Sequence, residues 1–155
     1  MLWRLRTRIG YAVARRLFHW SWLVKQPRGW RWLEGQFARM ANLGDVAAQS
    51  FYGHILLFRG QGFGAREEGM RLLRLAATGG EAKAAYQLGA LSLASDTRQA
   101  PDAVEAVRWW TLAAAAGHPL AARRLADLYC EGGPGLPADP EQATRFVQRA
   151  RELGL

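Results

Sequence analysis

Apolar and polar positions follow a helical period along most of the chain, and short glycine-rich segments interrupt the pattern. In residues 44–58, Tyr52 and Leu56 lie four positions apart, which places them on one side of a predicted helix. Three glycines in residues 60–64 are incompatible with a continuing helix. A second helix is predicted over residues 65–78, so the pattern describes two helices joined by a loop.

This helix pair recurs along the chain. Segment 44–53 reappears 36 positions later as 80–89, and a further 37 positions later as 117–126. Bulky pairs that precede alanines keep the same step, and they are Leu72-Leu73, Trp109-Trp110 and Phe146-Val147. The later helices are expected at residues 81–94, 102–116, 118–131 and 140–153, with breaks at 95–101 and 132–140. A fixed period of this length indicates a repeat architecture, in which each unit buries its apolar face against its neighbours. We therefore interpret the bulky pairs as packing positions.

The N-terminal region has a different pattern. Residues 29–43 match the end of a second helix and are predicted as a degenerate half-unit, with residues 2–24 as its partner helix and 25–29 as the turn. On a helical wheel the apolar arc consists of Leu2, Leu5, Ile9, Val13, Leu17, Trp20 and Val24. The opposite side carries Arg4, Arg8 and Arg15 together with Tyr11, Phe18 and Trp22.

The net charge of +8 is confined to this region. Residues 1–40 carry nine Lys or Arg and one acidic residue, Glu34, whereas residues 41–155 carry twelve of each sign. Five of the seven tryptophans also lie in residues 1–40. The apolar stretch 9–24 is interrupted by Arg15 and Arg16, which argues against a secretory signal and against a membrane-spanning helix. We expect a cytoplasmic protein, with contact to the inner face of a membrane as an alternative.

The repeated motifs resemble the SEL-one-like repeat, a relative of the tetratricopeptide repeat. The resemblance rests on Gly80–Gly89, on Trp109-Trp110 before an alanine run, and on the glycine-rich loop before Asp139. It implies an all-α fold, a right-handed α/α solenoid of three helix pairs plus the degenerate N-terminal pair. It also implies a role in binding other proteins, although fold alone does not determine function.

The domain boundaries follow from these motifs. Residues 1–28 are predicted as a basic, tryptophan-rich helix and turn. Residues 29–155 are predicted as the repeat domain, with the half-unit 29–43 and the repeats 44–79, 80–116 and 117–155.

No constellation of residues indicates catalysis or a cofactor. His19, His54 and His118 lack the spacing of a metal pair, and Cys130 is the only cysteine. We therefore expect no catalytic residues, no metal site, no cofactor and no enzymatic activity. Nucleic-acid binding is disfavoured because residues 41–155 have no net positive charge.

The expected function is that of an adaptor or scaffold that binds a protein partner on the concave face formed by the first helices of the repeats. The candidate contact residues are Phe51, His54, Tyr86, Gln87, Arg123, Arg124 and Asp127. The alternative is an anchor to an anionic membrane or an acidic partner through Arg4, Arg8, Arg15 and Trp22. The basic helix could equally serve as a cap on the repeats, and self-association through one open end is a further hypothesis.

Overall fold

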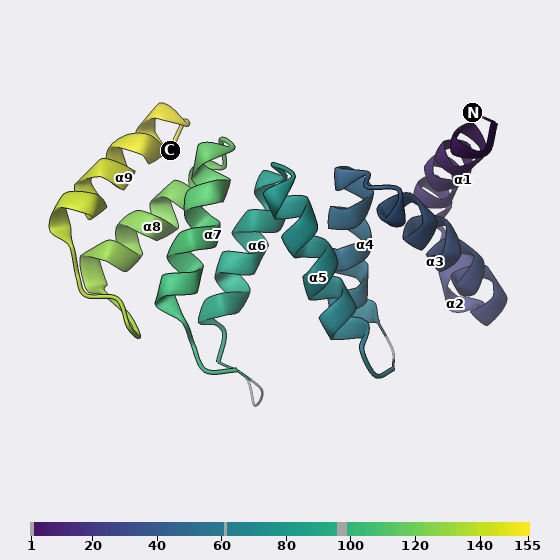
Figure 1. Cartoon of the computed structure of the whole chain (residues 1–155), viewed down its shortest axis with the longest axis horizontal. Helices are drawn as coiled ribbons and strands as arrows, with labels where there is room; N and C mark the ends of the chain where they lie inside the picture. The colour runs from purple at the N-terminus through teal and green to yellow at the C-terminus, as the bar shows by residue number, and fades with distance from the viewer. Residues whose placement is uncertain (1, 61, 96–98) are drawn as a thin grey trace. The chain divides into compact units, whose positions relative to one another are not determined.

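The computed structural model describes residues 2–60, 62–95 and 99–155, with only the backbone of Leu2. Every regular element in these ranges is a helix, so the predicted all-α class is confirmed (Figure 1). The helices are α1 (Leu2–Leu17), α2 (Ser21–Lys25), α3 (Pro27–Asn42), α4 (Val46–Arg59), α5 (Ala65–Thr78), α6 (Ala82–Leu93), α7 (Ala103–Ala115), α8 (Pro119–Glu131) and α9 (Pro140–Glu152). The predicted breaks 60–64 and 95–101 include residues 61 and 96–98, which lie outside the described residues.

The chain forms two compact units, residues 1–72 and 73–155, and the boundary falls within α5. Unit 1 contains α1 to α4 and the first half of α5. Unit 2 contains the second half of α5 and α6 to α9, in which α6 pairs with α7 and α8 with α9 in antiparallel fashion (Figure 1).

The core of unit 1 is built around Phe37 of α3, which is fully buried. The rings of Tyr11, Phe18 and Phe51 contact it edge-on, with centroids 5.2 to 6.0 Å away. Offset and edge-to-face aromatic contacts of this kind stabilise a core beyond the burial of area. Helix α1 is thus fixed to α3 and α3 to α4 through one aromatic cluster.

Unit 2 is packed with alanine and tryptophan. Trp109 and Trp110 of α7 are both buried, which confirms that the tryptophan pair is a packing feature. The indole of Trp110 lies against Gly89 of α6, where a Cβ atom would collide with the ring. Its Nε1 donates a hydrogen bond to the carbonyl oxygen of Tyr86, 3.0 Å away. The small residue at position 89 is therefore required for α6 and α7 to approach closely.

The repeat junctions share one turn. Gly80 and Gly117 have φ angles of +94° and +89°, which glycine adopts without the strain of a side chain. After each, a backbone N–H donates to a carbonyl five residues earlier, from Glu81 to Ala76 (3.0 Å) and from His118 to Ala113 (2.9 Å). These are Schellman turns, which satisfy the last carbonyls of a helix. The glycines that define the sequence period thus end one helix pair and open the next.

The N-terminal helix differs from its prediction in two respects. The predicted helix 2–24 is divided at residues 18–20 into α1 and α2, and α3 begins at Pro27, earlier than predicted. Proline is favoured in the first turn of a helix because its missing N–H would have no partner there. Residues 25–29 therefore do not form a separate turn.

Candidate interaction surfaces

Two groups of predicted contact residues lie in unit 2, on α6 and α8. Tyr86 of α6 is half-buried, and its ring stacks on that of His118, the N-cap residue of α8, at a centroid distance of 4.5 Å and an angle of 10°. Trp110 of α7 also lies beside Tyr86, with ring centroids 6.4 Å apart, so the ring of Tyr86 packs against residues of two neighbouring helices. Gln87 is half-buried next to it.

Helix α8 also carries exposed charged residues. Arg123 and Asp127 form an exposed ion pair of 3.1 Å, one helical turn apart. Arg124 is exposed, and among the described residues it makes no ion pair. Unit 2 therefore combines exposed guanidinium groups with a half-buried aromatic edge, the residue types that dominate the energetics of protein interfaces.

His118 has an unusual environment for a histidine at a helix start. Its Nδ1 is buried and, within the described part of the chain, lacks a hydrogen-bond partner. Burial, together with the nearby Lys83, lowers the pKa of the imidazole. The predicted helix 118–131 already placed His118 at a helix start, and the structure has it as the N-cap of α8. Its stacking on Tyr86 was not predicted.

In unit 1, Phe51 does not project freely from α4. Its ring lies 5.5 Å from that of Phe18 and 5.2 Å from that of Phe37, and the guanidinium of Arg15 covers it at 5.5 Å. Phe51 was predicted to contact a protein partner, and Arg15 a membrane or an acidic partner. In the structure the two residues contact each other. Both contribute to the packing of unit 1.

His54 is exposed on α4, and its ring lies 4.6 Å from that of Phe58. Phe58 is 63% exposed and was not predicted as a contact residue, although its position one helical turn after His54 could have indicated it. The next residue, Arg59, covers the ring of Phe18 at 5.4 Å.

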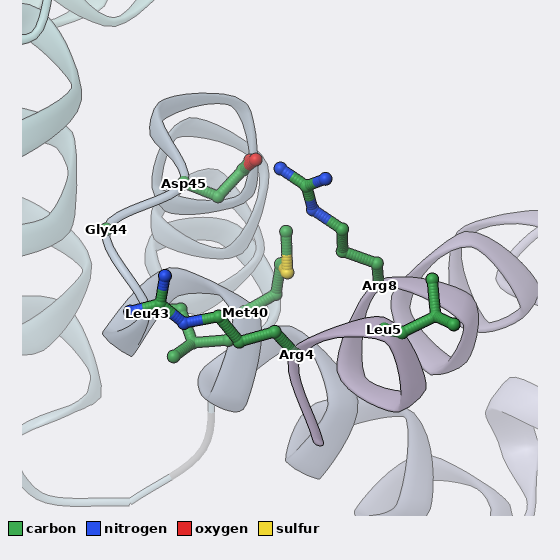
Figure 2. A pocket seen from close by; sticks show the side chains of 7 residues that line it. All are labelled: Arg4, Leu5, Arg8, Met40, Leu43, Gly44 and Asp45. Carbon is green, nitrogen blue, oxygen red and sulfur yellow. The ribbon is translucent and has the colours of Figure 1, made fainter. Parts of the chain in front are cut away.

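Arg4 and Arg8 of α1 line a cleft of about 710 Å³ in unit 1 (Figure 2). Its other lining residues are Leu5, Met40, Leu43, Gly44 and Asp45. The guanidinium of Arg8 and the carboxylate of Asp45 point toward one another across it (Figure 2). Asp45 is also the N-cap of α4, where Oδ1 accepts a hydrogen bond from the Ala48 N–H at 2.8 Å. The remaining predicted contact of the basic region, Trp22 of α2, is 68% exposed.

Helix α1 packs through the side that sequence analysis assigned to its polar face. Thr7, Tyr11 and Ala14 are buried. Leu5, Ile9 and Val13 of the predicted apolar arc are instead 57%, 57% and 44% exposed. The packed side offers small residues for close approach: a Cβ atom at Gly10 would collide with the side chain of Gln36. Burial raises the pKa of the Tyr11 hydroxyl, against the opposing effect of Arg15.

The described residues hold no group of three or more His, Cys, Asp or Glu side chains arranged to bind a metal ion. Cys130 is exposed and is a free thiol. Across the part of the chain that is described, the helices are too short or too polar to cross a bilayer.

Comparisons with known proteins agree with the repeat structure. Residues 46–81, 82–118 and 119–155 each match the Sel1 repeat. The fold is similar to that of a Sel1 repeat protein from Oxalobacter formigenes, with 30% identity and a TM-score of 0.67 over 78% of this chain. It is also similar to a protective antigen of uropathogenic Escherichia coli that displays an SLR fold, with 22% identity and a TM-score of 0.65 over 79% of this chain. The chain spans 34% of the first protein and 26% of the second. No match was found among the curated proteins.

Proposed function

Because the chain belongs to the Sel1 repeat family, whose members generally mediate protein–protein interactions, we propose that it is a noncatalytic adaptor that binds a protein partner through α6 and α8. This family assignment confirms the resemblance inferred from the sequence and the α/α solenoid class. Members of the family are typically interaction scaffolds without catalytic activity.

The observation that carries the proposal is the combination of exposed charge and aromatic surface on α6 and α8 of unit 2. Arg123 and Arg124 are exposed on α8, and the half-buried ring of Tyr86 lies against the N-cap of the same helix. A partner segment that offers carboxylates to the guanidinium groups and an apolar side chain to the edge of Tyr86 would match both features. In an α/α repeat, the first helices of the pairs form the expected concave surface, and α6 and α8 are the first helices of their pairs.

The proposal is tested with the double variant Arg123→Ala/Arg124→Ala in quantitative pull-down of the full chain from extracts of the source cells. Arg145→Ala is the matched control, because Arg145 is exposed on α9, the second helix of its pair. A partner that is recovered with wild type and with the control, and lost with the double variant, supports binding through α8. Equal recovery by all three chains contradicts it. Turnover of ester, peptide or phosphate substrates by the purified chain would contradict the noncatalytic role.

A further inference from the structure

The side of α1 that faces away from unit 1 is an apolar stripe between arginines. Leu5, Ile9 and Val13 are spaced four residues apart, so they follow one side of the helix, and each is about half exposed. At about 100° per residue, this side lies about 180° from the side formed by Thr7, Tyr11 and Ala14. Because the latter side is buried in unit 1, the apolar stripe is directed outward.

A cleft with arginines borders the stripe on each flank. Leu5 lines the cleft of Figure 2 together with Arg4 and Arg8. Ile9 lines a second cleft, of about 430 Å³, together with Arg6 and Arg39. The second cleft also contains the exposed indoles of Trp3 and Trp32. Apolar side chains in the centre and guanidinium and indole groups along the edges form the pattern of a helix that lies in a membrane interface.

We propose that α1 binds the surface of an anionic lipid bilayer. The apolar stripe inserts among the acyl chains nearest the surface, and the flanking arginines bind lipid phosphates. Indoles such as that of Trp3 lie at the level of the headgroups. Since α3 holds the opposite side of α1, unit 1 remains folded on the aqueous side of the helix.

Charge decides between the occupants that could cover this stripe. A second copy of the chain would bring another stripe flanked by arginines against the first, and like charges oppose that approach. Glu34 lies elsewhere, where its Oε1 accepts a hydrogen bond from the Tyr52 hydroxyl at 3.3 Å. Asp45 lines the first of the two clefts and faces Arg8 there (Figure 2), so it offsets the charge of that arginine only. An anionic surface complements the remaining arginines, and an outward-facing helix side suits a bilayer better than the groove that an acidic peptide requires.

The experiment measures sedimentation of the full chain with two kinds of vesicle. One kind is phosphatidylcholine alone, and the other contains about 30% of the anionic lipid phosphatidylglycerol. We expect binding to the anionic vesicles only, and weaker binding as salt is raised. The variant Leu5→Ser/Ile9→Ser/Val13→Ser should bind the anionic vesicles at least about tenfold more weakly, because inserted apolar area is lost. The variant Arg4→Gln/Arg6→Gln/Arg8→Gln should lose about fivefold per arginine.

The matched control is Val104→Ser/Leu112→Ser/Leu120→Ser, which replaces three equally exposed apolar residues of unit 2 and should bind as wild type does. Circular dichroism verifies that each variant retains its helices. Absence of binding to anionic vesicles, or equal loss in the control variant, overturns the proposal. So does binding that depends on the arginines alone. If sedimentation equilibrium shows a dimer that the serine variant of the stripe abolishes, while vesicles are not bound, a second copy occupies the stripe and the proposal fails.

Discussion

The guanidinium of Arg15 lies 5.5 Å from the centre of the Phe51 ring. Arg15 comes from the basic N-terminal helix and Phe51 from the first helix of the first repeat, so the contact fastens one to the other within unit 1. A guanidinium over an aromatic face contributes about 0.5–1 kcal/mol at a partly exposed site. Substitutions of either residue therefore act on the folding of unit 1 before they report on any binding.

Phe51→Ala is expected to lower the free energy of unfolding by about 2 kcal/mol, because a half-buried ring loses its contacts with Phe18 and Phe37. Urea denaturation followed by circular dichroism measures the change. Phe58→Ala is the control on the same helix: its ring is 63% exposed, and its removal should change stability by about 0.5 kcal/mol or less. Equal effects of the two substitutions would show that Phe51 is not part of the core.

Gly89→Ala is expected to destabilise unit 2 by about 1–3 kcal/mol, since the added methyl group collides with the indole of Trp110. Gly35→Ala provides the opposite case. Gly35 lies within α3, and the nearest atom to an added Cβ is the end of the flexible Arg39 side chain, 3.5 Å away. This second substitution should stabilise the protein by about 0.5–1 kcal/mol through helix propensity alone. Thermal or urea denaturation in which Gly89→Ala is as stable as wild type or more stable would contradict the close approach of α6 and α7.

Asp45→Ala is expected to cost about 1 kcal/mol of stability, because α4 loses the side-chain acceptor of its N-cap. Asp45→Asn keeps an acceptor at this position and should remain close to wild type. The pair therefore separates the capping role of Asp45 from its charge in the cleft shared with Arg8. If both variants lose the same stability, the carboxylate charge matters more than the cap.

Acidification is expected to destabilise unit 2 through His118. Burial, with Lys83 nearby, holds the pKa of this imidazole below its ordinary value of 6.5. As pH falls, the unfolded chain takes up a proton before the folded chain does. The contribution of His118 to stability is therefore complete above about pH 6.5 and declines below it, until the folded imidazole is protonated as well.

The measurement compares wild type with His118→Gln by urea denaturation at pH 7.5 and at pH 5.5, conditions chosen as about one unit on either side of the ordinary value. The variant should lose less stability between the two than wild type does. An NMR titration of the wild-type imidazole gives an independent reading, and an ordinary or raised pKa there would refute the assigned environment.

Sequence periodicity was sufficient for the repeat helices. The helix predicted over residues 65–78 coincides with α5, and the other repeat helices begin and end within two residues of their predictions. Glycines such as Gly80 and Gly117 occupy turns that other residues adopt only with strain. Because glycine is needed at these positions, the sequence itself indicates where the helices end.

The N-terminal helix was less accessible to the same reasoning. An amphipathic pattern identifies two sides of a helix but does not determine which side meets the rest of the protein when both carry apolar groups. Tyr11 and Ala14 offer less apolar area than Leu5, Ile9 and Val13, yet Tyr11 and Ala14 are the buried residues. The small side chains at positions 10 and 14 permit the close approach to α3, and such complementarity depends on the partner helix. The candidate site in unit 2 shows the same limit, since no local pattern places Tyr86 on His118, 32 positions later.

The Schellman turn that follows α5 and α7 is formed once more after α9. Gly154 has a φ of +99°, and the N–H of Leu155 donates to the carbonyl of Ala150 at 3.0 Å, as Glu81 does to Ala76. Leu155 therefore makes the same backbone hydrogen bond as Glu81 and His118, the residues that directly precede α6 and α8. A protein engineer could fuse a copy of residues 82–118 directly to Leu155, without a linker, and the added helix pair would enter in the same register as its predecessors.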